Sequence, residues 1–257
     1  MKIVYSVRSE MGNVRKNNQD NIYADGTIIT SADDTSFWLN AVSDTPSIVA
    51  VCDGMGGEKN GEKASYMAVE RMRENAVRIV CAATKELQHN YVQEYIDGVN
   101  STLNQEFERS GTTLAMAVIT DKEICCYNVG DTRIYSMEKK KLVQVTNDHS
   151  IYVLSDNGKG KGKRKKLTKC IGIGDCCQAD WHRIKNKKMR LLICSDGLYD
   201  MISDGEISDI MQQTTTAADV SDKLIKMALK KGGKDNVTVI VVDIPRQSFI
   251  EKIINKF

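Results

Sequence analysis

Short apolar runs that end at an aspartate are the feature that most constrains how this chain can fold. Residues 47–52 (SIVAVC) form such a run and Asp53 follows it, while residues 191–195 (LLICS) lead directly to Asp196. Runs of this length are typical of buried strands. They are interleaved with pairs of helical stretches and not with single helices, so we expect the strands to form largely antiparallel sheets.

The same patterns divide the rest of the chain into elements. The predicted strands are residues 2–9, 21–29, 47–52, 112–120, 123–129, 132–138, 141–145, 189–195 and 236–243. The predicted helices are residues 61–86, 90–108, 204–213 and 217–230, and the polar segment 30–46 is expected to be a loop or a hairpin insertion. No linker rich in proline or serine divides the chain, so we expect one domain over residues 1–246. Residues 247–257 follow as a tail with an amphipathic helical pattern, which is expected to pack on that domain.

Composition argues against several classes of protein. The formal net charge of +2 is too small for a surface specialised for nucleic acid or for an anionic membrane. No stretch approaches the ~18 apolar residues of a membrane span, and the first residues lack the apolar core of a signal peptide. The eight cysteines include no C-x-x-C pair and the three histidines lie far apart, so we expect free thiols and no zinc site. The sequence therefore predicts a cytoplasmic monomer that binds neither nucleic acid nor a membrane.

Five aspartates adjoin predicted strands: Asp20, Asp53, Asp131, Asp196 and Asp235. A single aspartate at the end of a strand is usually a turn residue or a helix cap. Five in corresponding places would repel one another unless a cation neutralised them, and oxygen ligands select Mg²⁺ or Mn²⁺. Glycine or asparagine adjoins these aspartates, and glycine lets the backbone approach a cation closely. The pattern thus predicts a metal cluster at one end of a sheet.

Seven motifs follow one another along the chain. They are G-N-V-R-K-N-N-Q-D at 12–20, V-C-D-G-M-G-G at 51–57, S-G-T-T at 110–113, N-V-G-D-T-R at 128–133, T-N-D-H-S at 146–150, C-S-D-G-L at 194–198 and G-K-D-N-V-T at 233–238. A chain with these motifs in this order resembles the protein phosphatase 2C-type (PPM, metal-dependent) serine/threonine phosphatases, and the compact bacterial members in particular. The resemblance implies an α+β fold, an αββα sandwich of four layers. In it, two antiparallel β-sheets lie face to face and a pair of helices covers each.

The resemblance also implies the metal ligands. Asp53 would bridge two ions, and Gly54 would offer its carbonyl oxygen to one of them. Asp196 and Asp235 would complete the coordination of the other ion. Asp131, together with Asp196, would hold a third and weaker ion. The implied cofactor is Mn²⁺ or Mg²⁺, two ions per site, with a third in bacterial members.

Further residues acquire expected roles from the same resemblance. Arg15 is expected to grip the substrate phosphate, and Asp20 to hydrogen-bond metal-bound water. Gln19 stands where the family often has glutamate; Gln19 and Asn236 are expected to act through water or through a neighbouring ligand. Met55 stands where eukaryotic members carry a histidine proposed as general acid, so the group that protonates the leaving oxygen is left open.

These residues suit the hydrolysis of phosphoserine and phosphothreonine in proteins. Two cations that share Asp53 would lower the pKa of a bridging water, and Arg15 would hold the phosphoryl group in line with it. Two alternatives stay open: a pseudophosphatase that binds phosphoproteins without turnover, and a phosphatase of small phosphoesters. The expected partners are phosphoprotein substrates, in particular those of a Ser/Thr kinase and the kinase itself.

Residues 157–169 (NGKGKGKRKKLTK) are the strongest charge anomaly, because they are rich in lysine and contain no acid. Such a run is either a solvated loop or a device that attracts anionic substrates. The resemblance places it in a flap beside the cleft. The residues considered for substrate steering are Lys161, Lys163, Arg164, Lys165 and Lys166.

Overall fold

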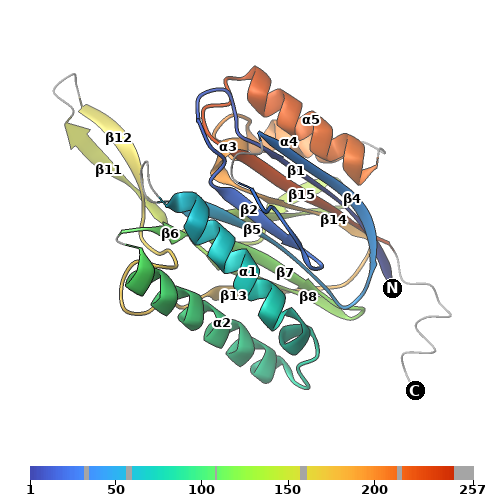
Figure 1. The fold of residues 1–257 in the computed structure, drawn as a ribbon. Helices are drawn as coiled ribbons and strands as arrows, with labels where there is room; N and C mark the ends of the chain where they lie inside the picture. Colours follow the sequence, from blue (N-terminus) through green and yellow to red (C-terminus); the bar gives the residue numbers. More distant parts are fainter. Residues whose placement is uncertain (32–34, 56–59, 108, 157–160, 213–215, 246–257) are drawn as a thin grey trace, which may run out of the picture.

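Two antiparallel sheets lie face to face in the computed structural model of residues 1–257 (Figure 1). The structure describes these residues except 32–34, 56–59, 108, 157–160, 213–215 and 246–257, and it leaves out the side chains of 155, 156, 161 and 162. Helices cover the outer face of each sheet, which produces four layers. The predicted αββα architecture is therefore confirmed.

The first sheet has the strand order β13-β8-β7-β5-β2-β3, with β6 paired to β5. Its strands are β2 (Asp20–Ala24), β3 (Thr27–Ile28), β5 (Ser47–Met55), β6 (Gly111–Thr112), β7 (Leu114–Ile119), β8 (Glu123–Val129) and β13 (Asp180–Lys185). Its outer face is covered by α1 (Gly61–Val80) and α2 (Lys85–Glu106).

The second sheet has the order β10-β9-β14-β15-β1-β4. Its strands are β1 (Lys2–Glu10), β4 (Ser36–Asp44), β9 (Arg133–Glu138), β10 (Lys141–Gln144), β14 (Met189–Cys194) and β15 (Val237–Ile244). The short helix α3 (Asp196–Tyr199) follows β14, and α4 (Asp204–Met211) and α5 (Ala217–Lys230) pack on the outer face. A separate hairpin of β11 (Ser150–Asp156) and β12 (Lys161–Leu167) projects from the body of the molecule (Figure 1).

Central strands are apolar on both faces because both faces are covered. In β5, Ile48 and Ala50 pack against the α1–α2 layer, while Val49 and Val51 pack between the two sheets. Successive side chains of a strand point to opposite faces, so a strand buried on both sides needs a continuous apolar run and not an alternating one. The apolar runs of the sequence therefore mark the middle of each sheet.

Strand β4 corrects the interpretation of segment 30–46 as a loop or hairpin insertion. All nine residues of β4 pair with β1, at one edge of the second sheet. Phe37, Leu39 and Ala41 face the core between the sheets, whereas Trp38 is exposed on the other face. The prediction was wrong because an edge strand with one open face keeps polar residues that resemble a loop.

The remaining differences are smaller. Helix α1 ends at Val80 and not at residue 86, and Thr84 caps α2 by accepting a hydrogen bond from the backbone N–H of Leu87 at 3.1 Å. The basic segment is not simply a loop, since residues 161–167 form β12. None of the described helices is long and apolar enough to cross a membrane. The predicted tail, 247–257, lies outside the described residues.

Candidate active site

A cleft of about 910 Å³ opens where strand ends of both sheets meet. Asp53 reaches it from β5, Asp131 from the β8–β9 connection, Asp196 from the start of α3 just after β14, and Asp235 from two residues before β15. Asp20 lies opposite Asp53 in the β2–β5 pairing. The structure thus brings the five predicted aspartates together, from elements that are far apart in the sequence.

Two glycines allow the backbones around the cleft to approach closely. A Cβ atom on Gly197 would lie 2.0 Å from the carbonyl oxygen of Asn236, so no side chain fits between the turn after β14 and the start of β15. A Cβ atom on Gly54 would lie 2.1 Å from the carbonyl oxygen of Gly61, at the start of α1. Both glycines are needed for packing between elements that carry the aspartates.

Arg15 reaches the cleft from the loop between β1 and β2. Its Nη2 donates to Asp235 Oδ2 at 2.5 Å, and its side chain remains 45% exposed. The hydrogen bond to Asp235 raises the pKa of the guanidinium above its ordinary value. Arg15 therefore lies beside a predicted metal ligand, with its head open to solvent and to a bound anion.

Asn236 fixes the loop that carries Arg15. The Asn236 side chain donates to the carbonyl oxygens of Met11 and Asn17, at 2.8 and 2.9 Å, and accepts from the backbone N–H of Gln19 at 2.9 Å. Asn236 is buried, and its amide is satisfied by backbone groups. It acts as a structural anchor of the loop.

Gln19 lines the cleft, whereas Asp20 is buried beside it. Gln19 Nε2 donates to Glu62 Oε2 at 3.4 Å, at the start of α1. Asp20 Oδ2 accepts from Ser195 Oγ at 2.7 Å, in a buried position. Asp20 therefore lies behind the carboxylates that line the cleft, paired with Asp53 across β2 and β5.

The buried carboxylates raise one another's pKa. Burial, followed by the charges of Asp20, Asp196, Asp131 and Asp235, raises the pKa of Asp53 well above its ordinary value. Burial is also the main cause that raises the pKa of Asp20 to about 7 and that of Asp196 to about 6. Such crowding is costly unless a cation neutralises it.

The donor set of the cleft fits hard divalent cations. Its side-chain donors are carboxylate oxygens, which Mn²⁺ and Mg²⁺ accept, and their mutual repulsion favours a bound cation. In this conformation, no three acidic, histidine or cysteine side chains of the described residues surround a common point. Three carboxylates face cationic side chains instead, since Asp235 binds Arg15, and Asp131 and Asp196 bind Lys165. A metal at Asp235 would release Arg15 for a substrate phosphate.

Lys165 departs from the predicted role of a steering residue. Its Nζ lies 2.5 Å from Asp131 Oδ2 and 3.2 Å from Asp196 Oδ2, and its side chain is only 19% exposed. Burial acts to lower its pKa, but the charges of Asp196 and Asp131 outweigh burial and raise the pKa. Its charge is therefore already paired inside the cleft.

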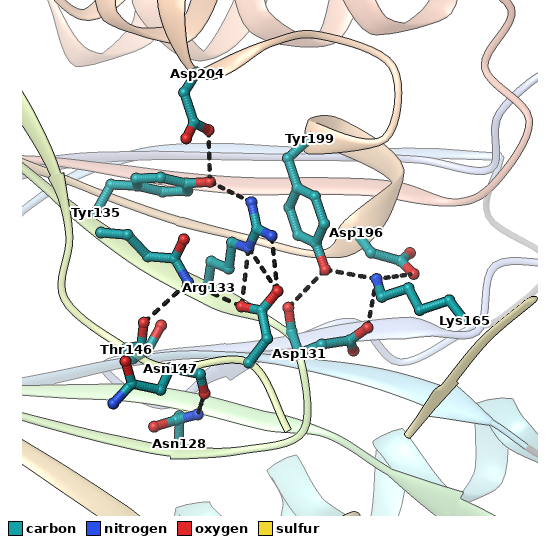
Figure 2. A network of polar contacts seen from close by, with 12 residues as sticks. Asn128, Asp131, Arg133, Tyr135, Thr146, Asn147, Lys165, Asp196, Tyr199 and Asp204 are labelled. Carbon is teal, nitrogen blue, oxygen red and sulfur yellow. Dashed lines mark hydrogen bonds and ion pairs between the residues drawn. The ribbon is translucent and has the colours of Figure 1, made fainter. Parts of the chain in front are cut away.

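A polar network that the sequence did not predict surrounds Lys165 and Asp131 at the edge of the cleft (Figure 2). Arg133 makes a bidentate pair with Asp148, donating from Nε to Oδ1 and from Nη2 to Oδ2, and its guanidinium stacks 3.6 Å from the centroid of the Tyr199 ring. Tyr199 Oη donates to the carbonyl oxygen of Asp131 at 2.8 Å, and Lys165 Nζ donates to Tyr199 Oη at 2.9 Å. Arg133 and Asp148 lie within motifs noted in the sequence, and Tyr199 directly follows one. Nothing in the lysine-rich run distinguishes Lys165 from its neighbours.

The other basic residues of the hairpin are distributed differently. Lys163, Arg164 and Lys166 are exposed on β12, and Arg164 also lines the cleft. Lys161 belongs to β12, but its side chain is outside the described atoms. The hairpin thus presents a cationic strand beside the cleft, with one lysine turned into it.

Comparison with known proteins gives a family match over most of the chain. A family model described as protein phosphatase 2C matches residues 29–231. The chain is 28% identical over 251 residues to the serine/threonine phosphatase stp of Listeria monocytogenes, covering 92% of this chain and 94% of that one. It is 29% identical over 253 residues to the protein phosphatase PhpP of Streptococcus pneumoniae, covering 93% and 96%.

Solved structures agree with the fold. The catalytic domain of the serine threonine protein phosphatase PstP, in complex with 2 manganese ions, superposes with a TM-score of 0.72 at 25% identity. The match covers 95% of this chain and 100% of that one.

Proposed function

This chain belongs to the protein phosphatase 2C family, as a bacterial-type serine/threonine protein phosphatase, and from that premise we propose how its cleft works. The observation that carries the proposal is the convergence of Asp53, Asp131, Asp196 and Asp235 on one cleft beside Arg15. Asp53, Gly54, Asp196 and Asp235 would hold two divalent ions, Mn²⁺ or Mg²⁺. When bound, the ions supply an activated water and neutralise charge on the phosphoryl group.

The chain's own residues bind and orient the substrate. Arg15 leaves Asp235 and takes two phosphoryl oxygens with its planar guanidinium, which holds the phosphorus in line for attack. Asn236 keeps the Arg15 loop in register with β15, because it bonds that loop at several backbone positions. Asp20 acts from behind the ligands and Gln19 from the wall of the cleft, by hydrogen bonds through water.

The substrates we propose are phosphoproteins, namely those made by a Ser/Thr kinase and the kinase itself. The enzyme acts as a cytoplasmic monomer in this proposal. Lys163, Arg164 and Lys166, and by its place on the same strand Lys161, attract acidic phosphoprotein segments toward the cleft. Their exposure on β12 supports this role for the first three.

A phosphopeptide assay tests the function. With Mn²⁺ present, the protein is expected to release phosphate from phosphothreonine and phosphoserine peptides. If two Mn²⁺ ions bind but no phosphate is released from any ester, the chain is a phosphoprotein-binding module. Turnover of p-nitrophenyl phosphate without turnover of any phosphopeptide would assign it to small phosphoesters.

Replacing Arg15 with lysine tests phosphate binding separately from metal binding. Lysine keeps the charge but cannot bind two oxygens with one planar group. Loss of one hydrogen bond to a charged group costs about 1.5–3 kcal/mol, so kcat/KM should fall roughly ten- to a hundredfold. Mn²⁺ affinity, measured by calorimetry, should not weaken.

The matched control for Arg15→Lys is Arg73→Lys, an exposed arginine on α1. Its kcat/KM should equal that of the parent. Equal kcat/KM in Arg15→Lys and the control would remove Arg15 from the proposed site.

A further inference from the structure

The ammonium group of Lys165 occupies a position with three oxygen atoms around it. Asp131 Oδ2 lies at 2.5 Å, Asp196 Oδ2 at 3.2 Å and Tyr199 Oη at 2.9 Å from Nζ. A lysine ammonium has three N–H donors and no acceptor, so each donor finds one oxygen. Figure 2 shows Lys165 entering from the hairpin toward these three groups.

This position is built by residues outside the hairpin. Tyr199 is held by its hydrogen bond to the Asp131 carbonyl oxygen and by the Arg133 guanidinium stacked on its ring. Arg133 is in turn fixed by Asp148 and by Tyr135 Oη, which accepts from Nη1 at 2.8 Å. The Tyr199 hydroxyl is therefore held by contacts that do not involve Lys165.

The two carboxylates that face Lys165 are the pair implied to hold a third and weaker divalent ion. Such an ion would need several oxygen ligands at about 2.0–2.2 Å and would repel an ammonium group on the same oxygens. The lysine and the third ion thus compete for Asp131 and Asp196. Asp196 is also a proposed ligand of the two-ion set, whereas the described polar contacts of Lys165 do not include Asp53 or Asp235.

We propose that Lys165 replaces the third divalent ion, so that this phosphatase binds two metal ions and uses a lysine of its own flap hairpin at the third position. The proposal rests on the two-metal function proposed above. It also gives the β11–β12 hairpin a definite place, because the hairpin is tied to the cleft through Lys165. Asp131 then serves to hold the hairpin, and not to bind a metal.

The experiment counts Mn²⁺ ions bound per full-length chain, by equilibrium dialysis and by the electron paramagnetic resonance signal of free Mn²⁺, up to millimolar Mn²⁺. The parent is expected to reach a plateau of two ions. Lys165→Gln, which keeps a polar side chain but removes the charge, should reach three. The Kd for the third ion should be at least ~tenfold lower for Lys165→Gln than for the parent, because the ammonium group that repels the ion is gone.

Three further variants locate the effect. Lys166→Gln removes the same charge from the neighbouring, exposed position of β12 and should stay at two ions. Lys165→Arg keeps the charge and should also stay at two. The double variant Lys165→Gln/Asp131→Asn should return to two ions, because the added ion loses a ligand.

The inference is overturned if the parent itself binds three ions, if Lys165→Gln stays at two, or if the added ion survives the Asp131→Asn change. Failure of the proposed function gives a different result, in which neither the parent nor any variant binds a pair of ions. Thermal melting of each variant at zero Mn²⁺ checks that the chain is folded before ions are counted.

Discussion

Asp53→Asn is expected to abolish turnover and, at the same time, to make the metal-free protein more stable. Asp53 lines the cleft from the end of β5 and is the proposed shared ligand of the two ions. Metal activation is worth several kcal/mol of transition-state stabilisation, so kcat for a phosphothreonine peptide should fall by about a thousandfold or more. Two-ion binding should be lost in calorimetry.

The gain in stability has an electrostatic cause. Burial makes the charge of Asp53 costly, and repulsion by four neighbouring aspartates adds to that cost. Asparagine has nearly the same shape without the charge, so the melting temperature in EDTA at pH 8 should rise above that of the parent. Asp209→Asn, an exposed position on α4, is the control and should change neither activity nor melting temperature. Normal two-ion binding by Asp53→Asn would contradict the assignment.

Removal of metal from the parent is expected to stop turnover and to make stability fall as the pH rises. Chelation with EDTA should reduce phosphate release to background, and added Mn²⁺ should restore it. The pKa of Asp20 is raised to about 7 and that of Asp196 to about 6, mainly by burial, from a usual carboxyl value near ~4. At a pH between the usual carboxyl pKa and these raised values, Asp20 and Asp196 hold protons in the folded chain that they have released in the unfolded chain.

The direction of the pH effect follows from proton linkage. Where the folded state binds more protons, the free energy of unfolding decreases with increasing pH. The melting temperature in EDTA should therefore fall from about pH 4 through pH 7, the window between the unfolded and folded pKa values. Mn²⁺ at a hundred times its Kd should add about 2.7 kcal/mol at pH 7.5. The cluster is not a metal site if the melting temperature in EDTA does not change between pH 4 and pH 7, or if turnover is complete in the presence of the chelator.

The central strands and the gathering of the aspartates at strand ends could be predicted because both leave local patterns in the sequence. A strand buried on both faces leaves a continuous apolar run, as in β5, and each aspartate follows or precedes such a run. Strand β4 was missed because its outer face is open and its sequence is correspondingly polar. The α1–α2 break was misplaced because the helical pattern continues past Val80, and the cap at Thr84 is one hydrogen bond.

The environment of Lys165 could not be predicted in the same way. Its partners lie on the β8–β9 connection and on α3, and the pairing depends on where the hairpin packs. The sequence shows only a run of similar lysines, each of which would favour solvent in isolation. Long-range packing selects one of them, and sequence spacing carries no signal for that choice.

The proposed ligands belong to both halves of the sandwich. Asp53 extends from the first sheet, whereas Asp196 and Asp235 adjoin strands of the second. Ions bound between them would cross-link the two sheets, so that the sandwich could not open without releasing metal. Proteolysis in a cell acts mainly on opened molecules, and a chain held closed by ions is degraded more slowly. The supply of divalent metal would then set how much of this phosphatase a cell retains, as well as how fast each molecule works.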